Sequence, residues 1–424
     1  MSSLSQVSGV YPTPRPLLTT RWPLKPLVMA VSYAYLIVRT PLLAAIYAVL
    51  PFTRPNPKLP VMASVAYSSF HIIFPLKTVL GTFTDRRGTK TLDPYKPGDR
   101  FKGVWIAPAR PQLLTGQIGD WLKQGGIKTV PLPGYWVGKD KDLDDVTARP
   151  GERIILNFHG GGYIDHTAHW TSPISNFFGE LIERIPDLDS QRGDKVRITR
   201  GFNLEYRLSD ETTFPGIVAD AVAAYAFLVE TCGFEPAHIT VMGDSAGGHL
   251  ALALIRHLRD TKVLPIPGNA VLTSPWTDLS MTTFHTTASA KANAGMDYLR
   301  NPAIIVARDQ VIRGMPIGSL ESPYLSPGLR AVVNAHTAPA LYKGFPPALF
   351  IAGGKERWHD EIVMSYHDYV EGDAPEERRR REQSALLVED DYPHDYVAFM
   401  QLGSYDAGIR AIERIYDFIA AAQA

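Results

Sequence analysis

The sequence predicts an α/β protein built on a mostly parallel sheet of eight strands, with helices on both faces and a helical cap. Two observations predict the sheet and the helices on its faces. From about residue 101 onward, strand-like apolar runs alternate with helix-length segments, an order typical of parallel sheets covered on both sides. Two glycine-rich turns also follow predicted strands directly, and open α/β sheets form their ligand sites at such strand ends.

The expected elements are taken in chain order. Strands are predicted at 102–108, 127–132, 153–158, 196–204, 238–242, 270–274, 348–352 and 385–389. Helices are predicted at 214–231, 246–259, 360–370 and 406–422. Pro215 near the start of the first helix and Gly233 just past its end occupy positions that proline and glycine favour. We therefore expect one large domain over residues 99–424. The cap expected within it, inserted at about 281–344, is implied by the resemblance described below.

The composition excludes several classes of protein. Of the 424 residues, 45% are hydrophobic and 20% are charged, which excludes a disordered or fibrous chain. Lysine plus arginine equals aspartate plus glutamate at 43 each, so no overall positive charge recruits nucleic acid. Cys232 is the single cysteine, which excludes an intramolecular disulfide and a cysteine-based zinc cluster. We expect no nucleic-acid partner, no metal and no cofactor.

Residues 1–98 are predicted to supply a hydrophobic segment and further cap helices, with 61–83 forming one or two helices. Residues 26–52 are apolar and long enough to cross a bilayer, but Arg39 and Pro41 interrupt them near the middle. Three alternatives stay open: one membrane anchor, an interfacial helical hairpin, or two helices packed on the protein. The expected location is therefore membrane-associated, with the endoplasmic reticulum as one candidate, or cytoplasmic, and not clearly secreted.

The run Gly243–Gly248 carries the most chemical information. It contains Gly-x-Ser-x-Gly directly after the predicted strand 238–242 and directly before an apolar helix. This context is that of a nucleophile elbow, in which small residues at 243 and 247 allow a tight turn and expose Ser245. The Ala246 N–H then lies at a helix N-terminus, where positive potential stabilises a developing oxyanion. Asp244 is expected to form structural hydrogen bonds.

A second motif, His159-Gly160-Gly161-Gly162, follows the predicted strand 153–158. Consecutive glycines expose backbone N–H groups without side-chain obstruction, as an oxyanion hole requires. Gly161, Gly162 and Ala246 are therefore the predicted oxyanion donors, with His159, Gly160, Gly243, Asp244 and Gly247 supporting the two motifs. A phosphate-binding loop is excluded, because neither GxxxxGK[ST] nor GxGxxG occurs.

These two motifs, about 85 residues apart, resemble those of the hormone-sensitive-lipase family of α/β-hydrolases. More narrowly, the chain is similar to fungal members with a hydrophobic N-terminus, including steryl acetyl hydrolases. Further stretches that resemble the family are Glu205–Leu208, Phe214-Pro215 with Asp220, and Ser274–Leu279. The resemblance covers roughly residues 150–400; the first hundred residues match only in general character. It implies the α/β-hydrolase fold and a serine esterase or lipase.

A serine nucleophile needs a base and a carboxylate, which in this fold follow the serine in the order acid, then histidine. Of the later histidines, only His394 lies just past the last predicted strand and before the final helix, as the family pattern requires. In the family, an Asp-Glu pair follows the acid by four and five residues, which selects Glu356 ahead of Asp360-Glu361. Glu356 replaces the commoner aspartate, and Asp360 is the alternative acid.

The expected reaction is hydrolysis of a carboxylic ester through an acyl-enzyme. The resemblance implies a small apolar substrate with a short acyl group, such as an acetylated sterol, a terpenoid or another secondary metabolite of a fungus. The alternatives are an acyltransferase or an arylformamidase-type amidase that uses the same triad. A non-catalytic ligand receptor on the same scaffold is a third alternative, which the presence of His394 disfavours. The sequence does not define the physiological substrate or the oligomeric state.

Overall fold

In the computed structural model, eight strands of the described residues form one mixed sheet in the order β1-β2-β4-β3-β5-β6-β7-β8. The structure describes residues 9–14, 21–80, 92–94, 96, 99–139, 143, 145–193, 196–329, 339–371 and 382–421. The strands are β1 (Phe101–Ile106), β2 (Leu132–Gly138), β3 (Ile154–Phe158), β4 (Arg200–Leu204), β5 (Ile239–Asp244), β6 (Asn269–Thr273), β7 (Ala348–Gly353) and β8 (Ala385–Glu389). β2 pairs antiparallel with β1 and β4, and the remaining neighbours are parallel. The predicted fold class is confirmed.

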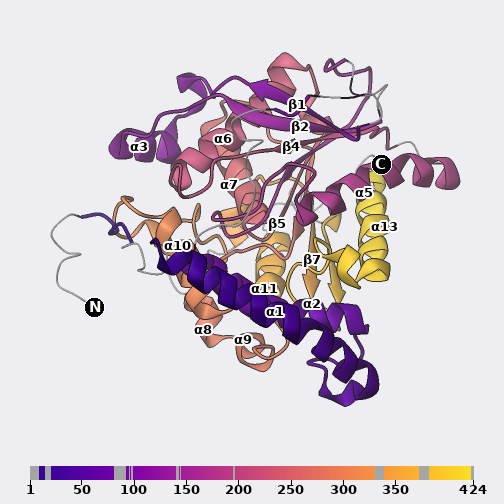
Figure 1. The fold of residues 1–424 in the computed structure, drawn as a ribbon. Coiled ribbons are helices and arrows are strands. Elements are labelled where there is room, and N and C mark those ends of the chain that lie inside the picture. Colours follow the sequence, from indigo (N-terminus) through magenta and orange to yellow (C-terminus); the bar gives the residue numbers. More distant parts are fainter. Residues whose placement is uncertain are drawn as a thin grey trace.

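Helices cover both faces of this sheet (Figure 1). On one face, α5 (Pro173–Arg192) and α13 (Tyr405–Ala421) pack on a core that includes Ile155 of β3. On the other face, α3 (Gly116–Gly125), α6 (Phe214–Ala226), α7 (Ala246–Thr261) and α11 (His359–Val370) pack on a core that includes Ile154 and Leu156. Neighbouring residues of a strand point to opposite faces, so the continuous apolar run of β3 serves both layers.

The predicted helices 214–231, 246–259, 360–370 and 406–422 correspond to α6 with the π-turn that follows it, α7, α11 and α13. In α7, every side chain from Ala246 to Leu258 is buried, and the helix ends at Lys262 in a left-handed conformation. Shorter helical turns connect the elements. They are Pro51–Thr53, Pro111–Leu113, Phe227–Thr231, Pro236–His238, Ser319–Glu321, Pro339–Tyr342 and Met400–Leu402.

The prediction of a strand at 127–132 is wrong. Those residues form the connection from α3 to β2: Gly126 ends the helix at φ 60°, and the Ile127 N–H donates to Leu122 O. The strand begins only at Leu132, in a segment that contains Pro133 and two glycines. Proline and glycine disfavour a strand, so the strand was predicted in the apolar residues that precede them. β2 forms nevertheless, because it is hydrogen-bonded on both sides.

The N-terminal apolar segment is one continuous helix, α1 (Leu24–Val49), which passes through Pro41. The hairpin and the two-helix alternatives for residues 26–52 are therefore wrong. A second helix, α2 (Val61–Leu80), packs against α1. By length and composition, α1 and Phe214–Thr231 are the helices of the described residues that could cross a membrane, and the second of these is 78% buried in the core.

The segment predicted to form the cap contains three short helices: α8 (Thr282–Thr286), α9 (Ala288–Ala292) and α10 (Asn301–Val311). Residues 330–338 of this segment lie outside the described residues. α10 contacts α2, so the inserted segment and the N-terminal helices meet although they are more than 200 residues apart in the chain. The two segments assigned to the cap thus lie together in space.

Candidate active site

Ser245 stands at the sharp turn between β5 and α7. Its backbone has φ 51° and ψ −114°, in the positive-φ range that side-chain-bearing residues adopt rarely. The turn brings Gly247 against the end of β3, where a Cβ atom at position 247 would lie 2.0 Å from Phe158 O. Glycine is therefore required at 247, as the elbow motif predicts. The turn places Ser245 at the carboxyl end of the parallel strands.

His394 lies in the loop between β8 and α13, and its imidazole reaches back to Ser245. His394 Nε2 is 3.0 Å from Ser245 Oγ, although the two residues are 149 positions apart in the chain. The imidazole is nearly fully buried, with 2% of the side chain exposed. The structure therefore brings the predicted nucleophile and the predicted base within hydrogen-bond distance.

Glu356 lies on the other side of the same imidazole. Its Oε2 atom is 2.9 Å from His394 Nδ1, and the carboxylate is fully buried. The Gly353 N–H and the Ser274 hydroxyl both donate to Oε1, at 2.6 and 3.2 Å. These donors fix the carboxylate toward the histidine. The alternative acid, Asp360, instead accepts a hydrogen bond from the Ser289 N–H at the start of α9.

The glycine loop after β3 lies beside Ser245. Gly161 and Gly162 both line the cavity that contains the serine, with φ of 108° and 62°. A Cβ atom at 161 would lie 2.4 Å from Asp165 O, so this loop needs glycine on steric as well as conformational grounds. Ala246, the third predicted donor, begins α7 directly after the serine. Gly161 and Gly162 thus line the same cavity as Ser245, and Ala246 follows that serine directly.

The remaining motif residues hold these two loops together. Asp244 Oδ1 accepts a hydrogen bond from the Gly160 N–H at 2.9 Å, which joins the elbow to the glycine loop. His159 stacks on the ring of Tyr206 with 4.4 Å between ring centroids, and the Tyr206 hydroxyl donates to His159 O. Burial, followed by the charge of Asp395, raises the pKa of Asp244 well above its ordinary value.

Sequence reasoning missed one carboxylate at the centre of the site. Asp395 Oδ2 lies 3.3 Å from His394 Nε2, on the nitrogen that also faces Ser245. Its backbone has φ 53°, and its N–H donates to Ser274 Oγ. Burial lowers the pKa of His394, but Asp395 and Glu356 outweigh burial and hold the pKa well above its ordinary value.

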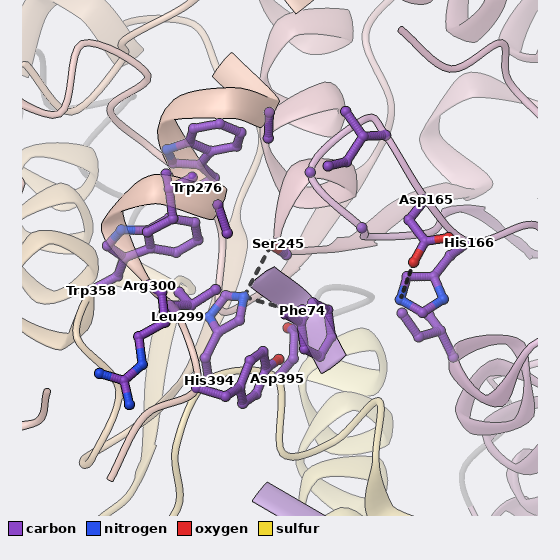
Figure 2. Close-up of a pocket in the computed structure, with 18 of the residues that line it drawn as sticks. Phe74, Asp165, His166, Ser245, Trp276, Leu299, Arg300, Trp358, His394 and Asp395 are labelled. Atoms are coloured by element: carbon purple, nitrogen blue, oxygen red, sulfur yellow. Dashed lines mark hydrogen bonds and ion pairs between the residues drawn. The ribbon is translucent and has the colours of Figure 1, made fainter. Parts of the chain in front are cut away.

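The site opens into a cavity of about 680 Å³, which includes the space open to solvent. Figure 2 shows His394 joined by dashed lines to Ser245 and to Asp395, with Trp276 and Trp358 on one side of the cavity and Asp165 and His166 on the other. Most other lining side chains are apolar, among them Phe74 of α2 and Tyr298, Ile304 and Ala307 of the inserted segment. Apolar walls with few polar groups are typical of a small-molecule site.

The walls of the cavity come from segments that are distant in the chain. The rings of Phe74 and Tyr298 stack with 4.7 Å between centroids, and Tyr298 lies edge-on to His394 at 5.8 Å. Trp276 and Trp358 stack on each other at 5.6 Å, and Trp358 also lies edge-on to His394 at 4.8 Å. Phe74 lies in the N-terminal segment and Tyr298 in the inserted segment. Sequence reasoning did not identify these side chains, because ring contacts depend on how the segments pack.

A hydroxyl on a strand-to-helix turn, with an imidazole and a buried carboxylate aligned behind it on a mostly parallel sheet, defines the class of α/β hydrolases. Comparison with known proteins agrees with this class. A family profile for the α/β hydrolase fold matches residues 199–382. An acetyl-hydrolase of Streptomyces hygroscopicus is 34% identical over 60% of this chain and 72% of its own length. The chain belongs to the α/β hydrolase family, as an esterase or lipase.

Other similar proteins extend over less of the chain or share less sequence. A triacylglycerol lipase of Mycobacterium tuberculosis is 31% identical over 51% of this chain and 44% of its own length. The crystal structure of an esterase from the bacterial hormone-sensitive lipase family, at 22% identity, covers 85% of this chain and 91% of its own, with a TM-score of 0.51, which shows the fold. The predicted membership in the α/β hydrolase family is confirmed; specificity for steryl acetates stays a prediction.

Proposed function

We propose that the protein hydrolyses carboxylic esters through an acyl-enzyme on Ser245. The observation that carries this proposal is the continuous chain of contacts from Ser245 Oγ to His394 Nε2 and from His394 Nδ1 to Glu356 Oε2. In its neutral form, His394 takes the proton of Ser245 as the hydroxyl attacks the ester carbonyl. Glu356 holds the imidazole in position and stabilises the imidazolium that results.

The tetrahedral oxyanion is stabilised by backbone donors. We assign this role to the N–H groups of Gly161, Gly162 and Ala246, each worth roughly 3 kcal/mol in the barrier by comparison with other oxyanion holes. Collapse of the intermediate expels the alcohol, which takes its proton from His394. Water then attacks the acyl-enzyme with His394 again as the base, and the acid is released.

The substrate we propose is an ester with an apolar body and a short acyl group. The apolar cavity walls support the first part of this assignment. The stacked indoles of Trp276 and Trp358 support the second, because both line the cavity beside Ser245 and limit the space there; the backbone N–H of Trp276 also donates to Ser245 O. Two relatives are named acetyl-hydrolase and ethyl acetate hydrolase, which agrees with a short acyl group. Acetylated sterols and terpenoids fit this description.

Labelling with a fluorophosphonate probe tests the nucleophile. Wild-type protein should be labelled, and Ser245→Ala should not be, with a loss of kcat on p-nitrophenyl butyrate of about 10⁴–10⁶-fold. Ser190→Ala, an exposed serine on α5, is the matched control and should label like the wild type. Labelling of Ser245→Ala at the wild-type level would refute the assignment.

A series of p-nitrophenyl esters with acyl chains of two to sixteen carbons tests the substrate class. We expect kcat/KM to be highest for chains of two to four carbons. A strong preference for long chains would contradict the proposed role of the indoles. The products formed with a competing alcohol then separate hydrolysis from acyl transfer, because only an acyltransferase forms the new ester in preference to the free acid.

A further inference from the structure

The charged residues are distributed unevenly along the chain. The first 84 residues contain seven lysines and arginines and not one aspartate or glutamate, so all 43 acidic residues follow that point. The balanced total charge conceals this asymmetry. A cationic, apolar segment attached to a net acidic domain is the charge pattern of a region that meets an anionic lipid surface.

α1 packs on the protein along one of its faces. Arg39 Nη1 donates to Ser68 O of α2 at 3.3 Å, and the Tyr47 hydroxyl lies 3.0 Å from Ser68 Oγ. Beyond the helix end, the Arg54 side chain donates to Tyr47 O at 2.8 Å. These contacts join the middle and the C-terminal end of α1 to α2. A helix held in this way cannot be surrounded by lipid on all sides, as a spanning helix would be.

The opposite face of α1 is apolar and lies open to solvent. Five aliphatic side chains at helical spacing form a stripe along it: Leu27, Val31, Val38, Leu42 and Val49, each 59–76% exposed. We call these five residues the α1 stripe. Phe52, 76% exposed, continues it past the helix end. Figure 1 shows α1 running along the outside of the molecule, over α2. Exposed apolar surface of this extent marks an interaction site.

We propose that α1 lies flat on an anionic bilayer surface, with the α1 stripe inserted among the lipids and without spanning the membrane. Three features favour lipid over a second copy of the chain. The segment contains no acidic residue, so two copies would bring like charges together. Arg21 and Lys25 stand at the helix start, where their side chains can reach phosphate groups. Tyr33, Tyr35 and Ile37, 51–72% exposed, widen the apolar surface beside the stripe, and tyrosine is enriched where proteins meet the bilayer interface.

This surface also lies close to the active site. α2, on which α1 packs, carries Phe74 into the cavity and contacts α10, which forms another part of the cavity wall. A bilayer under α1 is therefore separated from the cavity by one helix layer. If the proposed esterase function holds, apolar esters dissolved in the membrane are within short reach of Ser245. The docking itself does not depend on that function.

Vesicle sedimentation of the full-length protein tests the proposal. We expect binding to vesicles of phosphatidylcholine with about 30% phosphatidylserine, weaker binding to phosphatidylcholine alone, and release by high salt or alkaline carbonate. Val38→Asp with Leu42→Asp should weaken binding to the anionic vesicles by about tenfold or more. Ile317→Asp, at a 51%-exposed position of the inserted segment, is the matched control and should bind like the wild type.

The outcomes separate docking from its alternatives. Activity of the stripe variant on soluble p-nitrophenyl butyrate should equal that of the wild type, which shows that it folds and keeps its site. If the protein stays bound to vesicles in alkaline carbonate and binds anionic and neutral vesicles equally, the proposal is overturned in favour of a spanning helix. A stripe variant that dissociates a dimer but binds vesicles normally would overturn it in favour of self-association. Absence of vesicle binding by the wild type would also overturn it.

Discussion

Asp395 Oδ2 lies 3.3 Å from His394 Nε2, on the ring nitrogen that must accept the proton of Ser245. A carboxylate at this nitrogen stabilises the imidazolium, in which Nε2 carries a proton and cannot act as a base. The carboxylates of Glu356, Asp297 and Asp244 also face the imidazole. The pKa of His394 is therefore held well above its ordinary value of 6.5.

We expect a pH profile of kcat/KM whose acid limb lies above the ordinary histidine value. Activity needs neutral His394, so it should rise as the pH passes upward through the raised pKa. Asp395→Asn removes one charge that raises this pKa, so the acid limb should move to lower pH. The measurement is kcat/KM on p-nitrophenyl butyrate between pH 5 and 9.5. Asp406→Asn, at an exposed position on α13, should leave the profile in place; an unmoved limb in Asp395→Asn would contradict this prediction.

A second prediction separates the two candidate acids. Glu356→Gln keeps the size of the side chain but removes the charge that orients and stabilises the imidazolium, so kcat should fall by about 10³–10⁴-fold. Asp360→Asn should change kcat by less than about fivefold, because Asp360 contacts Ser289 and His359 and not the reacting groups. The kcat values of the two variants, measured side by side, distinguish the two candidate acids. Equal losses would show that Glu356 has no special role.

A third prediction concerns the roof of the cavity. Phe74 of α2 stacks on Tyr298, and both side chains line the cavity. Phe74→Ala should enlarge the space above Ser245, raise KM for short esters by several-fold through lost apolar contact, and shift the preferred acyl chain to greater length. Met62→Ala, at an exposed position on the same helix, serves as the control. A chain-length profile identical to the wild type would exclude Phe74 from substrate contact.

The parts of this site that depend on local backbone geometry could be predicted from the sequence. Gly247 is required because a Cβ atom at that position would lie 2.0 Å from Phe158 O. Such a requirement appears in the sequence as a motif around Ser245. His394 could be located because the fold fixes its order in the chain. Asp395 follows His394 directly and was still missed, because its orientation depends on a left-handed backbone at φ 53° that no motif signals.

The aromatic side chains over the site and the position of strand β2 could not be predicted, because they depend on contacts between distant segments. Phe74, Tyr298 and Phe399 form one aromatic group, although they lie on three segments separated by more than 100 residues. Packing between distant segments leaves no periodic pattern in the sequence. β2 was placed too early for a related reason: its pairing with β1 and β4 overrides the weak strand preference of Pro133 and Gly134.

The last prediction concerns stability at acidic pH. Burial lowers the pKa of His249 in α7 to about 3, and its Nδ1 atom lies 2.6 Å from the Tyr163 hydroxyl beside the glycine loop. The unfolded chain binds a proton at this histidine below about pH 6.5, whereas the folded protein does not until much lower pH. The free energy of unfolding should therefore fall as the pH drops from 6.5 toward 3, by up to about 1.4 kcal/mol per pH unit from this residue.

Urea unfolding of the wild type and His249→Gln at pH 7.5 and 5.0 measures this contribution. The variant should be less stable than the wild type at pH 7.5, because the Tyr163 contact is altered, yet lose less free energy between the two pH values. Burial also lowers the pKa of His71 and His257, so the variant should keep part of the acid sensitivity. His285→Gln, at an exposed position, should follow the wild type. An equal loss in wild type and His249→Gln would show that His249 is protonated in the folded protein at pH 5, and that its surroundings are more polar than the contacts described above.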